Sequence, residues 1–533
     1  MTLSKRVLVP LPEKGVTVRR SGRYNTVFKV LRYFRDENGR PNNDRVVIGK
    51  LDHESGLLIP NDKYWDYYES KTINISPYYR SNRSIGASFL IGHILDSLGI
   101  TKILNERLDE ELVSQIRTVV LYMTTRGNIL EGVMDFCEEF TLSEKPLDSR
   151  MASELFSSIT YDDKMAFFRK WSAIHVPGSF LAYDVTSFST YAKNIADSEF
   201  GYNRDGDKLP QINFGCYVSQ SSGLPVFFVT YPGSIVDKSH LPYMMAYNKE
   251  LGITDVGFVL DRVFCSTNNI KYMNKEHLNF ILGIDLMCKS TKDAIDSIRS
   301  KIMTMRNRID DKGTYGTTVH DLFYGVNLSM HIYYNPEMAE LKRQELFRKI
   351  EAKEEILAQK KELTKKELRM YRNYFIIDLA VNGSFNYTRD YDKIDKMAEN
   401  CGIFCLLTNT NLDSARVLSI YRQRDMIEKS FDDLKNYIDM KRMRTHNTAT
   451  TEGKLFCAFL SLIVVSEIGV KLGEMMKKKS WSKARLITEL EKIRVVESNE
   501  GIRQTNPLTK TQRLILETFG LKEVDLTDYI ARH

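Results

Sequence analysis

The sequence predicts an α/β protein in which helices cover a mixed sheet, preceded by a basic β-rich segment and a helical region. Three observations support this fold class. Strand-like and helix-like patterns alternate between residues 178 and 284. Apolar residues recur at helical spacing between residues 84 and 175. Runs of β-branched and aromatic residues, separated by a turn signal, fill the first 51 residues.

Length and composition exclude several classes of protein. The 533 residues suggest three or four domains at about 100–200 residues each. Hydrophobic residues are 42% and charged residues 27%, an ordinary globular mixture. The net charge of +7 excludes an acidic disordered protein and permits a polyanionic partner. Seven cysteines without any C-x-x-C pair argue against a zinc finger and favour a reduced, cytoplasmic chain.

No membrane segment is expected. The N-terminus has no apolar run behind it, so a secretory signal is not predicted. The longest apolar stretch, residues 455–470, is shorter than the ~20 residues of a membrane span and contains Glu467. We therefore interpret it as a buried helix.

Positive charge is concentrated at the N-terminus. Residues 1–50 hold 12 basic and 4 acidic residues, a net charge of +8 that exceeds that of the whole chain. The expected strands are Val16–Arg20, Tyr24–Phe34 and Arg45–Leu51, with a turn at residues 36–43. Contact with DNA phosphates and a solvated sheet edge protected by charge are both open interpretations.

The remaining elements follow from periodicity. Residues 84–175 predict a small all-helical domain, which would suit a helix-turn-helix reader without proving one. The expected strands after it are Phe180–Val185, Gln211–Ser219, Leu224–Tyr231, Val256–Leu260, Phe280–Ile284 and Ile403–Thr408. The expected helices are 236–251, 268–275, 412–435 and 455–470.

Residues 285–400 interrupt this regularity. Short strands are expected around Thr317–Tyr324, Leu328–Tyr334 and Phe375–Val381. Residues 341–375 carry 11 basic and 6 acidic residues and predict a long helix or a helical hairpin. A solvated charged helix is the favoured interpretation, and contact with DNA or a second protomer is the alternative.

Three carboxylates are candidates for one site. Asp184 and Asp261 lie at the ends of two predicted apolar strands, where a carboxylate is held rigidly at an edge open to solvent. Either residue alone is typical of a turn or a helix cap, but their placement in one sheet favours a shared site. The third candidate, Glu428, comes from the predicted helix 412–435.

That helix presents four polar side chains together. Tyr421, Arg424, Glu428 and Lys435 stand at offsets 0, 3, 7 and 14, and at about 100° per residue they span an arc of about 60°. A surface helix with i,i+4 pairs such as Arg424–Glu428 is the alternative. As a site, the three carboxylates would hold two divalent ions about 3.5–4 Å apart, while Tyr421, Arg424 and Lys435 bind DNA phosphates.

These residues also form a family signature. Tyr421, Arg424, Glu428 and Lys435 match Y-x(2)-R-x(3)-E-x(6)-K in full, after strand motifs that end at Asp184 and Asp261. The sequence resembles bacterial insertion-sequence transposases of the DDE class, although Val263 stands where that family usually has Gly. The segment 231–237 is similar to a recurrent loop of the same family.

The resemblance implies a fold and a reaction. It implies an RNase H-like core interrupted by a strand-rich insertion before the third carboxylate. The 167 residues between Asp261 and Glu428 are too many for a simple connection, which agrees with such an insertion. It also implies that Asp184, Asp261 and Glu428 bind two Mg²⁺ ions, with Mn²⁺ able to substitute. The implied activity is nicking of double-stranded DNA at the element's ends and transfer of the 3′-hydroxyls into target DNA, by a homodimer on paired ends. In a bacterial cytoplasm such a protein would be nucleoid-associated when bound to DNA.

The expected domain organisation follows from these patterns. It comprises a basic β-rich segment (1–80), a helical DNA-binding domain (81–175), the first part of the catalytic core (176–284), an insertion (285–401), the second part of the core (402–470) and a helical tail for dimerisation (471–533). Two other functions remain open: an RNase H-like nuclease that cuts without joining, and a non-catalytic DNA-binding protein derived from a transposase. A scaffolding role for residues 341–375 would explain their charge but not the carboxylates.

Overall fold

The computed structural model describes residues 8–21, 24–52, 55–68, 79–141, 146–286, 288–380, 384–498 and 501–533. The chain forms two compact units. The first comprises Met1–Asn82 and Val496–Gln504, and the second comprises Arg83–Val495 and Thr505–His533. The domain boundaries expected within the second unit stay predictions.

The first unit is built on a four-stranded antiparallel sheet. Its strands are β1 (Val16–Ser21), β2 (Tyr24–Arg35), β3 (Pro41–Leu51) and β4 (Leu58–Pro60), in chain order. These confirm the three predicted strands, although β3 begins four residues before the predicted Arg45. One face of the sheet covers a small hydrophobic core, which contains Val27, Ile48, Leu58 and Tyr64. A second sheet joins β5 (Tyr79–Ser84), β16 (Arg494–Ser498) and β17 (Arg503–Thr505).

The second unit begins with the predicted helices. They are α1 (Gly86–Ser97), α2 (Ile100–Asn105), α3 (Glu110–Arg126), α4 (Val133–Phe140), α5 (Ser149–Ser158) and α6 (Tyr161–His175). Side chains of Asp109, Asp148 and Thr160 accept hydrogen bonds from backbone N–H groups in the first turns of α3, α5 and α6. Such caps satisfy N–H groups that the helix itself leaves unpaired.

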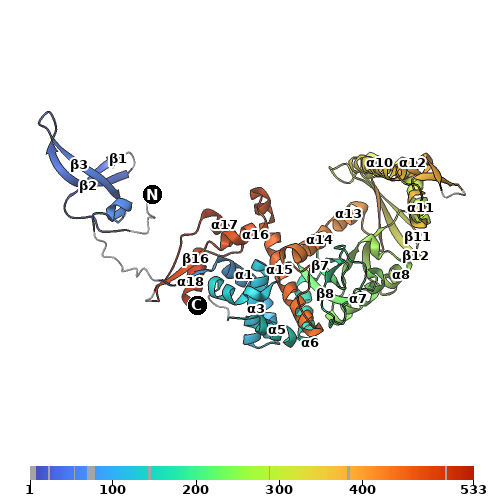
Figure 1. Ribbon diagram of the computed structural model, residues 1–533, viewed down its shortest axis with the longest axis horizontal. Coiled ribbons are helices and arrows are strands. Elements are labelled where there is room, and N and C mark those ends of the chain that lie inside the picture. Colours follow the sequence, from blue (N-terminus) through green and yellow to red (C-terminus); the bar gives the residue numbers. More distant parts are fainter. Residues whose placement is uncertain are drawn as a thin grey trace. The chain divides into compact units, whose positions relative to one another are not determined.

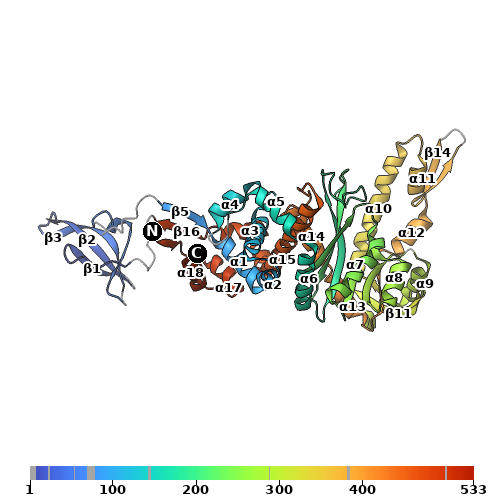
Figure 2. The same ribbon diagram turned by 90° about the horizontal axis from the view of Figure 1, so that it is seen from below.

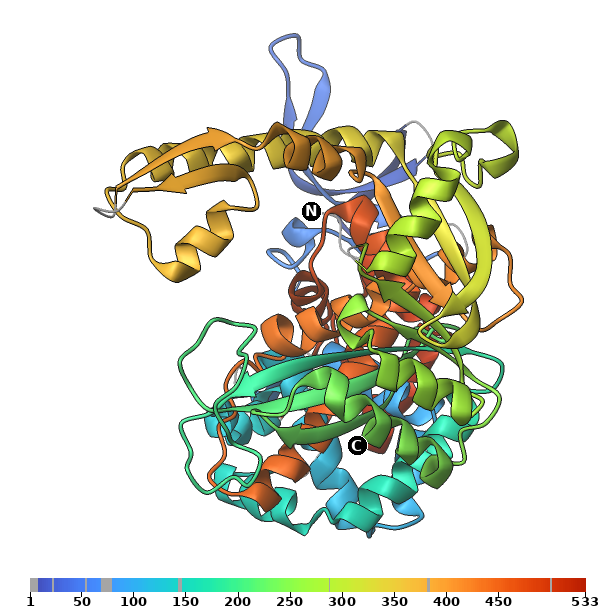
Figure 3. The same ribbon diagram turned by 90° about the vertical axis from the view of Figure 1, so that its right-hand side faces the viewer.

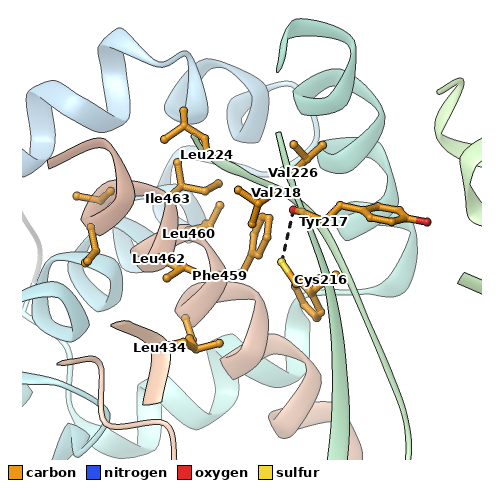
Figure 4. Packing of buried hydrophobic residues seen from close by; sticks show 14 of the residues in the cluster. Cys216, Tyr217, Val218, Leu224, Val226, Leu434, Phe459, Leu460, Leu462 and Ile463 are labelled. Carbon is orange, nitrogen blue, oxygen red and sulfur yellow. Dashed lines mark hydrogen bonds between the residues drawn. The ribbon is translucent and has the colours of Figure 1, made fainter. Parts of the chain in front are cut away.

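Helix α15 (Thr448–Lys479) is the central core element, and it extends beyond the predicted 455–470. It packs on α3, α5 and strand β8 (Pro225–Pro232). Figure 4 shows Phe459, Leu460 and Ile463 of α15 among Val218, Leu224 and Val226. Among the described residues, α15 alone is long and apolar enough to cross a membrane, and 83% of its apolar window is buried within the protein. An all-round apolar helix of this kind suits a protein core.

An eight-stranded mixed sheet lies against these helices (Figures 1 and 3). Its order is β11-β12-β15-β10-β9-β6-β7-β8. Besides β8, the strands are β6 (Phe180–Ser189), β7 (Gln211–Ser219), β9 (Gly257–Leu260), β10 (Asn279–Ile284), β11 (Tyr315–Phe323), β12 (Val326–Tyr334) and β15 (Ile403–Thr408). Strands β6, β9 and β10 are parallel and the other pairs are antiparallel. The predicted fold class is confirmed.

Helices and short strands complete the second unit. Helices α7 (Asp237–Leu251), α8 (Thr267–Lys275) and α9 (Lys289–Ile298) connect and follow the sheet strands. After β15 come α13 (Ser414–Arg422) and α14 (Asp425–Asp432). The C-terminal part adds α16 (Lys483–Leu490), α17 (Lys510–Thr518) and α18 (Glu523–Arg532).

The segment 336–399 forms a small core of its own. It contains α10 (Pro336–Ala358), α11 (Lys365–Tyr371), β13 (Phe375–Leu379), β14 (Phe385–Arg389) and α12 (Tyr391–Glu399). Ile350, Leu357 and Phe375 are at its centre. The basic stretch 341–375 is thus a helical hairpin, and Figure 2 shows α10 reaching beyond the sheet. Strands β11 and β12, in contrast, extend the main sheet, and the predicted strand end at Val381 lies outside the described residues.

Candidate active site

Strands β6 and β9 place two carboxylates side by side. The two strands pair in parallel up to Tyr183 and Leu260, so that Asp184 and Asp261 are the next residue on each. Asp261 follows the end of β9, as predicted. The prediction that Asp184 also ends its strand was wrong, because pairing with β7 carries β6 on to Ser189. Both carboxylates nevertheless lie where the parallel pairing stops.

The backbone holds both aspartates in place. The Asp184 Oδ1 atom accepts a hydrogen bond of 2.8 Å from the Val185 N–H, and Asp261 Oδ1 accepts one of 3.2 Å from the Val263 N–H. The second bond caps the turn Arg262–Phe264. The Val263 N–H can donate this bond whatever its side chain, so the absent glycine does not disturb Asp261.

The prediction of one continuous helix over residues 412–435 was wrong. Helices α13 and α14 meet at Gln423 and Arg424. At this junction the backbone N–H groups of residues 423, 424, 426 and 427 each donate a hydrogen bond to the carbonyl oxygen three residues earlier in the chain. A π-helical turn follows at Asp433–Tyr437. Since both features change the rotation per residue, the arc calculated for a continuous helix does not apply. Arg424 and Glu428 still face the sheet, but Lys435 is redirected.

One guanidinium group contacts all three predicted catalytic carboxylates. The Arg424 Nη1 atom lies 3.3 Å from Asp184 Oδ2, and Nη2 lies 3.1 Å from Asp261 Oδ2 and 2.5 Å from Glu428 Oε1. The Arg424 side chain is 13% exposed, whereas that of Glu428 is 55% exposed. The structure therefore brings together residues from two strands and one helix that are up to 244 positions apart in the sequence.

Burial and charge act in opposite directions on this cluster. Burial raises the pKa of Asp184 to about 6, although the Val185 N–H and Arg424 both favour its charged form. Burial lowers the pKa of the Arg424 guanidinium, but the adjacent carboxylates outweigh this effect and the net shift is upward. Asp184 and Arg424 therefore each stabilise the charged form of the other against the cost of burial.

Tyr421 lies beside the cluster on the last turn of α13. Its ring centroid is 5.9 Å from the Arg424 guanidinium carbon. Burial raises the pKa of its hydroxyl group. A Cβ atom at Gly283 in β10 would lie 2.8 Å from the Tyr421 hydroxyl oxygen. The missing side chain of this glycine therefore makes room for Tyr421.

Lys435 is not part of the Arg424 cluster. It is buried, and its Nζ atom lies 2.7 Å from Asp205 Oδ2 in the β6–β7 connection. Arg442 pairs with Asp207 in the same connection. The sequence does not predict these acidic partners, because nothing in the residues around Asp205 signals a contact with Lys435, which is 230 residues away.

The loop 231–237, which resembles a loop of the transposase family, contacts the same β6–β7 connection. Asp237 accepts a hydrogen bond of 2.7 Å from the Tyr231 hydroxyl and pairs with Arg204. Gly201 and Gly233 are in direct contact, since a Cβ atom on Gly201 would lie far inside the van der Waals distance of the Gly233 carbonyl oxygen. The loop resemblance thus corresponds to a packing role beside the site.

The carboxylate oxygens of the cluster are suitable ligands for a divalent ion, but the Arg424 guanidinium group now lies between them. Carboxylate oxygens from three residues are the hard ligands that Mg²⁺ prefers. Within the described ranges, no group of three His, Cys, Asp or Glu side chains is close enough to hold a metal ion as it stands. The Arg424 guanidinium, itself a cation, lies among the three carboxylates instead. The donor set fits a metal, provided that Arg424 moves.

Comparison with known families decides the class of protein. Residues 176–464 match the transposase DDE domain, and this match spans more than half of the 533 residues. The chain belongs to the transposase DDE domain family. It is therefore a DDE-class transposase, a family that generally works with divalent metal ions. The matched region contains all six predicted site residues, whose individual roles stay predictions.

Two further comparisons concern whole chains. Among solved structures, the transposase is similar to the synaptic complex of piggyBac transposase with hairpin DNA, at 10% sequence identity and a TM-score of 0.38. That alignment covers 84% of each chain. The comparison with curated proteins gave no match.

Proposed function

We propose that this transposase binds the ends of an insertion sequence, cuts the DNA there and joins the freed 3′-hydroxyls to target DNA. The observation that supports this proposal is the convergence of Asp184, Asp261 and Glu428 on one guanidinium, within a chain of the DDE family. In the first step, water attacks the phosphodiester and the 3′-oxygen leaves. In the second step, the resulting 3′-hydroxyl attacks a phosphodiester of the target, and the target's own 3′-oxygen leaves.

Asp184, Asp261 and Glu428 are the residues that would hold two Mg²⁺ ions, which Mn²⁺ could replace. Such ions, when bound, stabilise negative charge on the phosphodiester oxygens as Lewis acids. The two aspartates are fixed by the sheet and by the backbone N–H groups of Val185 and Val263. Glu428 is more exposed, so the site opens to solvent on the side of α14.

Tyr421, Arg424 and Lys435 are proposed to bind DNA phosphates. Tyr421 and Arg424 lie next to the carboxylates and would act close to the scissile bond. Lys435 is held by Asp205, so a phosphate could take its Nζ atom only in exchange for that ion pair. We further propose that a homodimer holds the two DNA ends.

The first unit is proposed to contribute DNA affinity. Cross-strand pairing places five side chains on one face of its sheet. They are Arg19, Thr26, Val30, Arg45 and Lys50. The opposite face carries Val16, Lys29 and Val46 toward the small core. Arg45 lies 4.9 Å above the Phe28 ring on the open face. Cations displayed in this way suit a phosphate backbone.

Alanine substitution of each carboxylate tests the proposed chemistry. The variants Asp184→Ala, Asp261→Ala and Glu428→Ala should lose Mg²⁺-dependent cleavage of DNA carrying the element's ends, by at least ~10³-fold, yet retain binding in a gel-shift assay. Asp378→Ala, at an exposed position of β13, is the matched control and should cleave normally. Undiminished cleavage by any of the three carboxylate variants would contradict the assignment.

A nuclease that cuts without joining is the second candidate. DNA with pre-cut 3′-hydroxyl ends separates the two functions, because joining then needs no prior hydrolysis. We expect products joined to a supercoiled target plasmid. Cleavage of intact ends together with no joined product from pre-cut ends would favour the nuclease.

A further inference from the structure

Arg424 occupies the centre of the carboxylate cluster. Its two terminal nitrogens reach Asp184, Asp261 and Glu428 at 3.3, 3.1 and 2.5 Å. Its side chain is only 13% exposed, and those of Asp184 and Asp261 are 20% and 25% exposed. A single, mostly buried guanidinium group thus pairs with three carboxylates.

Such a cluster requires a cation. Like charges held close together in a partly buried site repel one another, and burial penalises each charged form. Arginine suits the position because its guanidinium stays protonated and presents several donors in one plane. In the metal-free chain Arg424 therefore compensates the charge that metal ions would compensate in the loaded site.

We propose that Arg424 is an internal counter-ion that holds the metal-free site together and must leave the carboxylates when metal binds. This inference rests on the proposed function, because it takes the three carboxylates as the metal ligands. It assigns Arg424 two successive partners. The guanidinium pairs with the carboxylates first, and after its release it is available to a DNA phosphate.

The surroundings of Arg424 allow this exchange. The residue lies at the junction of α13 and α14, and its side chain makes no capping hydrogen bond to α14. Glu428, its closest partner, is more than half exposed, so the cluster is open on that side. The Tyr421 ring borders the same space. The released guanidinium can therefore turn toward solvent without passing through the core.

Competition for the same oxygens has a measurable consequence. Part of the free energy of metal binding is used to displace Arg424, so removing the arginine should strengthen metal binding. By linkage, a DNA phosphate that engages Arg424 should also strengthen it. A residue that merely positions metal-bound carboxylates would act in the opposite direction, since its loss would weaken metal binding.

Calorimetric titration of the full-length protein with Mn²⁺ tests the proposal. We expect Arg424→Gln to bind Mn²⁺ about 5-fold more tightly than the unchanged protein, or better. The matched control is Arg422→Gln, from the same helical segment, because Arg422 pairs with Asp310 instead. The control should bind Mn²⁺ with unchanged affinity.

Thermal unfolding gives a second measurement. In EDTA, Arg424→Gln should melt below the unchanged protein, and added Mn²⁺ should remove most of that difference. Arg424→Lys keeps one charge without the planar fork, and it should melt between the two in EDTA. Equal or weaker Mn²⁺ binding by Arg424→Gln would overturn the inference. No Mn²⁺ binding by the unchanged protein would instead contradict the proposed function.

Discussion

At the scale of single residues, position in the sheet accounts for the site better than residue type. Asp184 and Asp261 occupy equivalent positions on neighbouring parallel strands, one residue past their last shared pair. Lys435 matches the family signature equally well, yet the π-helical turn at Asp433–Tyr437 directs it to Asp205. Matching a signature therefore identified residues near the site, while backbone geometry determined which of them converge.

A buried histidine should make stability depend on pH. His331 in β12 is fully buried, and its Nδ1 atom lies 2.8 Å from the Thr318 hydroxyl. Burial lowers its pKa to about 4, so below pH 6.5 the unfolded chain binds a proton that the folded chain does not. Stability should therefore fall as the pH drops from 6.5 toward 4, by up to about 3 kcal/mol from this residue.

Urea denaturation at pH 7 and pH 5 measures this effect. His331→Gln should lose less stability between the two pH values than the unchanged protein. His446→Gln, at an exposed position, should behave as the unchanged protein does. Equal pH dependence in all three proteins would refute the role of His331.

At the scale of elements, the central helix was predicted but its length and neighbours were not. The apolar run 455–470 indicated a buried helix, and α15 extends it at both ends to Thr448 and Lys479. In its first turns Thr451 and Lys454 are buried although they are polar, and α15 contacts α5, α16 and α17, which periodicity cannot reveal. Likewise, β6 is longer than its apolar run because β7 pairs with its polar end.

Two glycines of α15 should respond to alanine in opposite ways. A Cβ atom at Gly453 would lie 2.0 Å from the Phe156 carbonyl oxygen of α5, whereas nothing lies within 4 Å at Gly473. Gly453→Ala should destabilise the protein by about 1–3 kcal/mol, because the two helices must separate. Gly473→Ala should stabilise it by up to about 1 kcal/mol through helix propensity. Chemical denaturation of both variants provides the comparison, and stabilisation by Gly453→Ala would contradict the close packing of α15 on α5.

At the scale of the whole molecule, the excess positive charge is concentrated near the N-terminus, in the first of the two units. The first 50 residues carry +8 against +7 for the entire chain, so the remainder is nearly neutral. The family match begins at residue 176 and lies wholly in the second unit. We propose that the nearly neutral second unit, which holds the three predicted metal-binding carboxylates, depends on the separate basic sheet for part of its DNA affinity.

The basic face should govern the salt dependence of DNA binding. Replacing Arg19, Arg45 and Lys50 together by Gln should reduce the slope of log K against log salt by about 2–3, because each neutralised phosphate adds about 0.9 to that slope. Arg32→Gln is the control, because Arg32 forms an ion pair with Asp44 on the opposite face of the same sheet. Fluorescence anisotropy over a range of salt concentrations measures the slope. An unchanged slope in the triple variant would exclude this face as a DNA-binding surface.

The sequence by itself determined the class of fold, most strands and the identity of the acidic residues, because periodicity and short motifs are local properties. It also carried four residues, Tyr421, Arg424, Glu428 and Lys435, whose spacing resembles that of DDE transposases. Only the tertiary structure decided that Asp184 continues a strand, that the predicted helix 412–435 breaks at Arg424, and that Lys435 pairs with Asp205. These features arise from contacts between segments up to 244 residues apart, where pairing with β7 and the attraction of three carboxylates outweigh local preference.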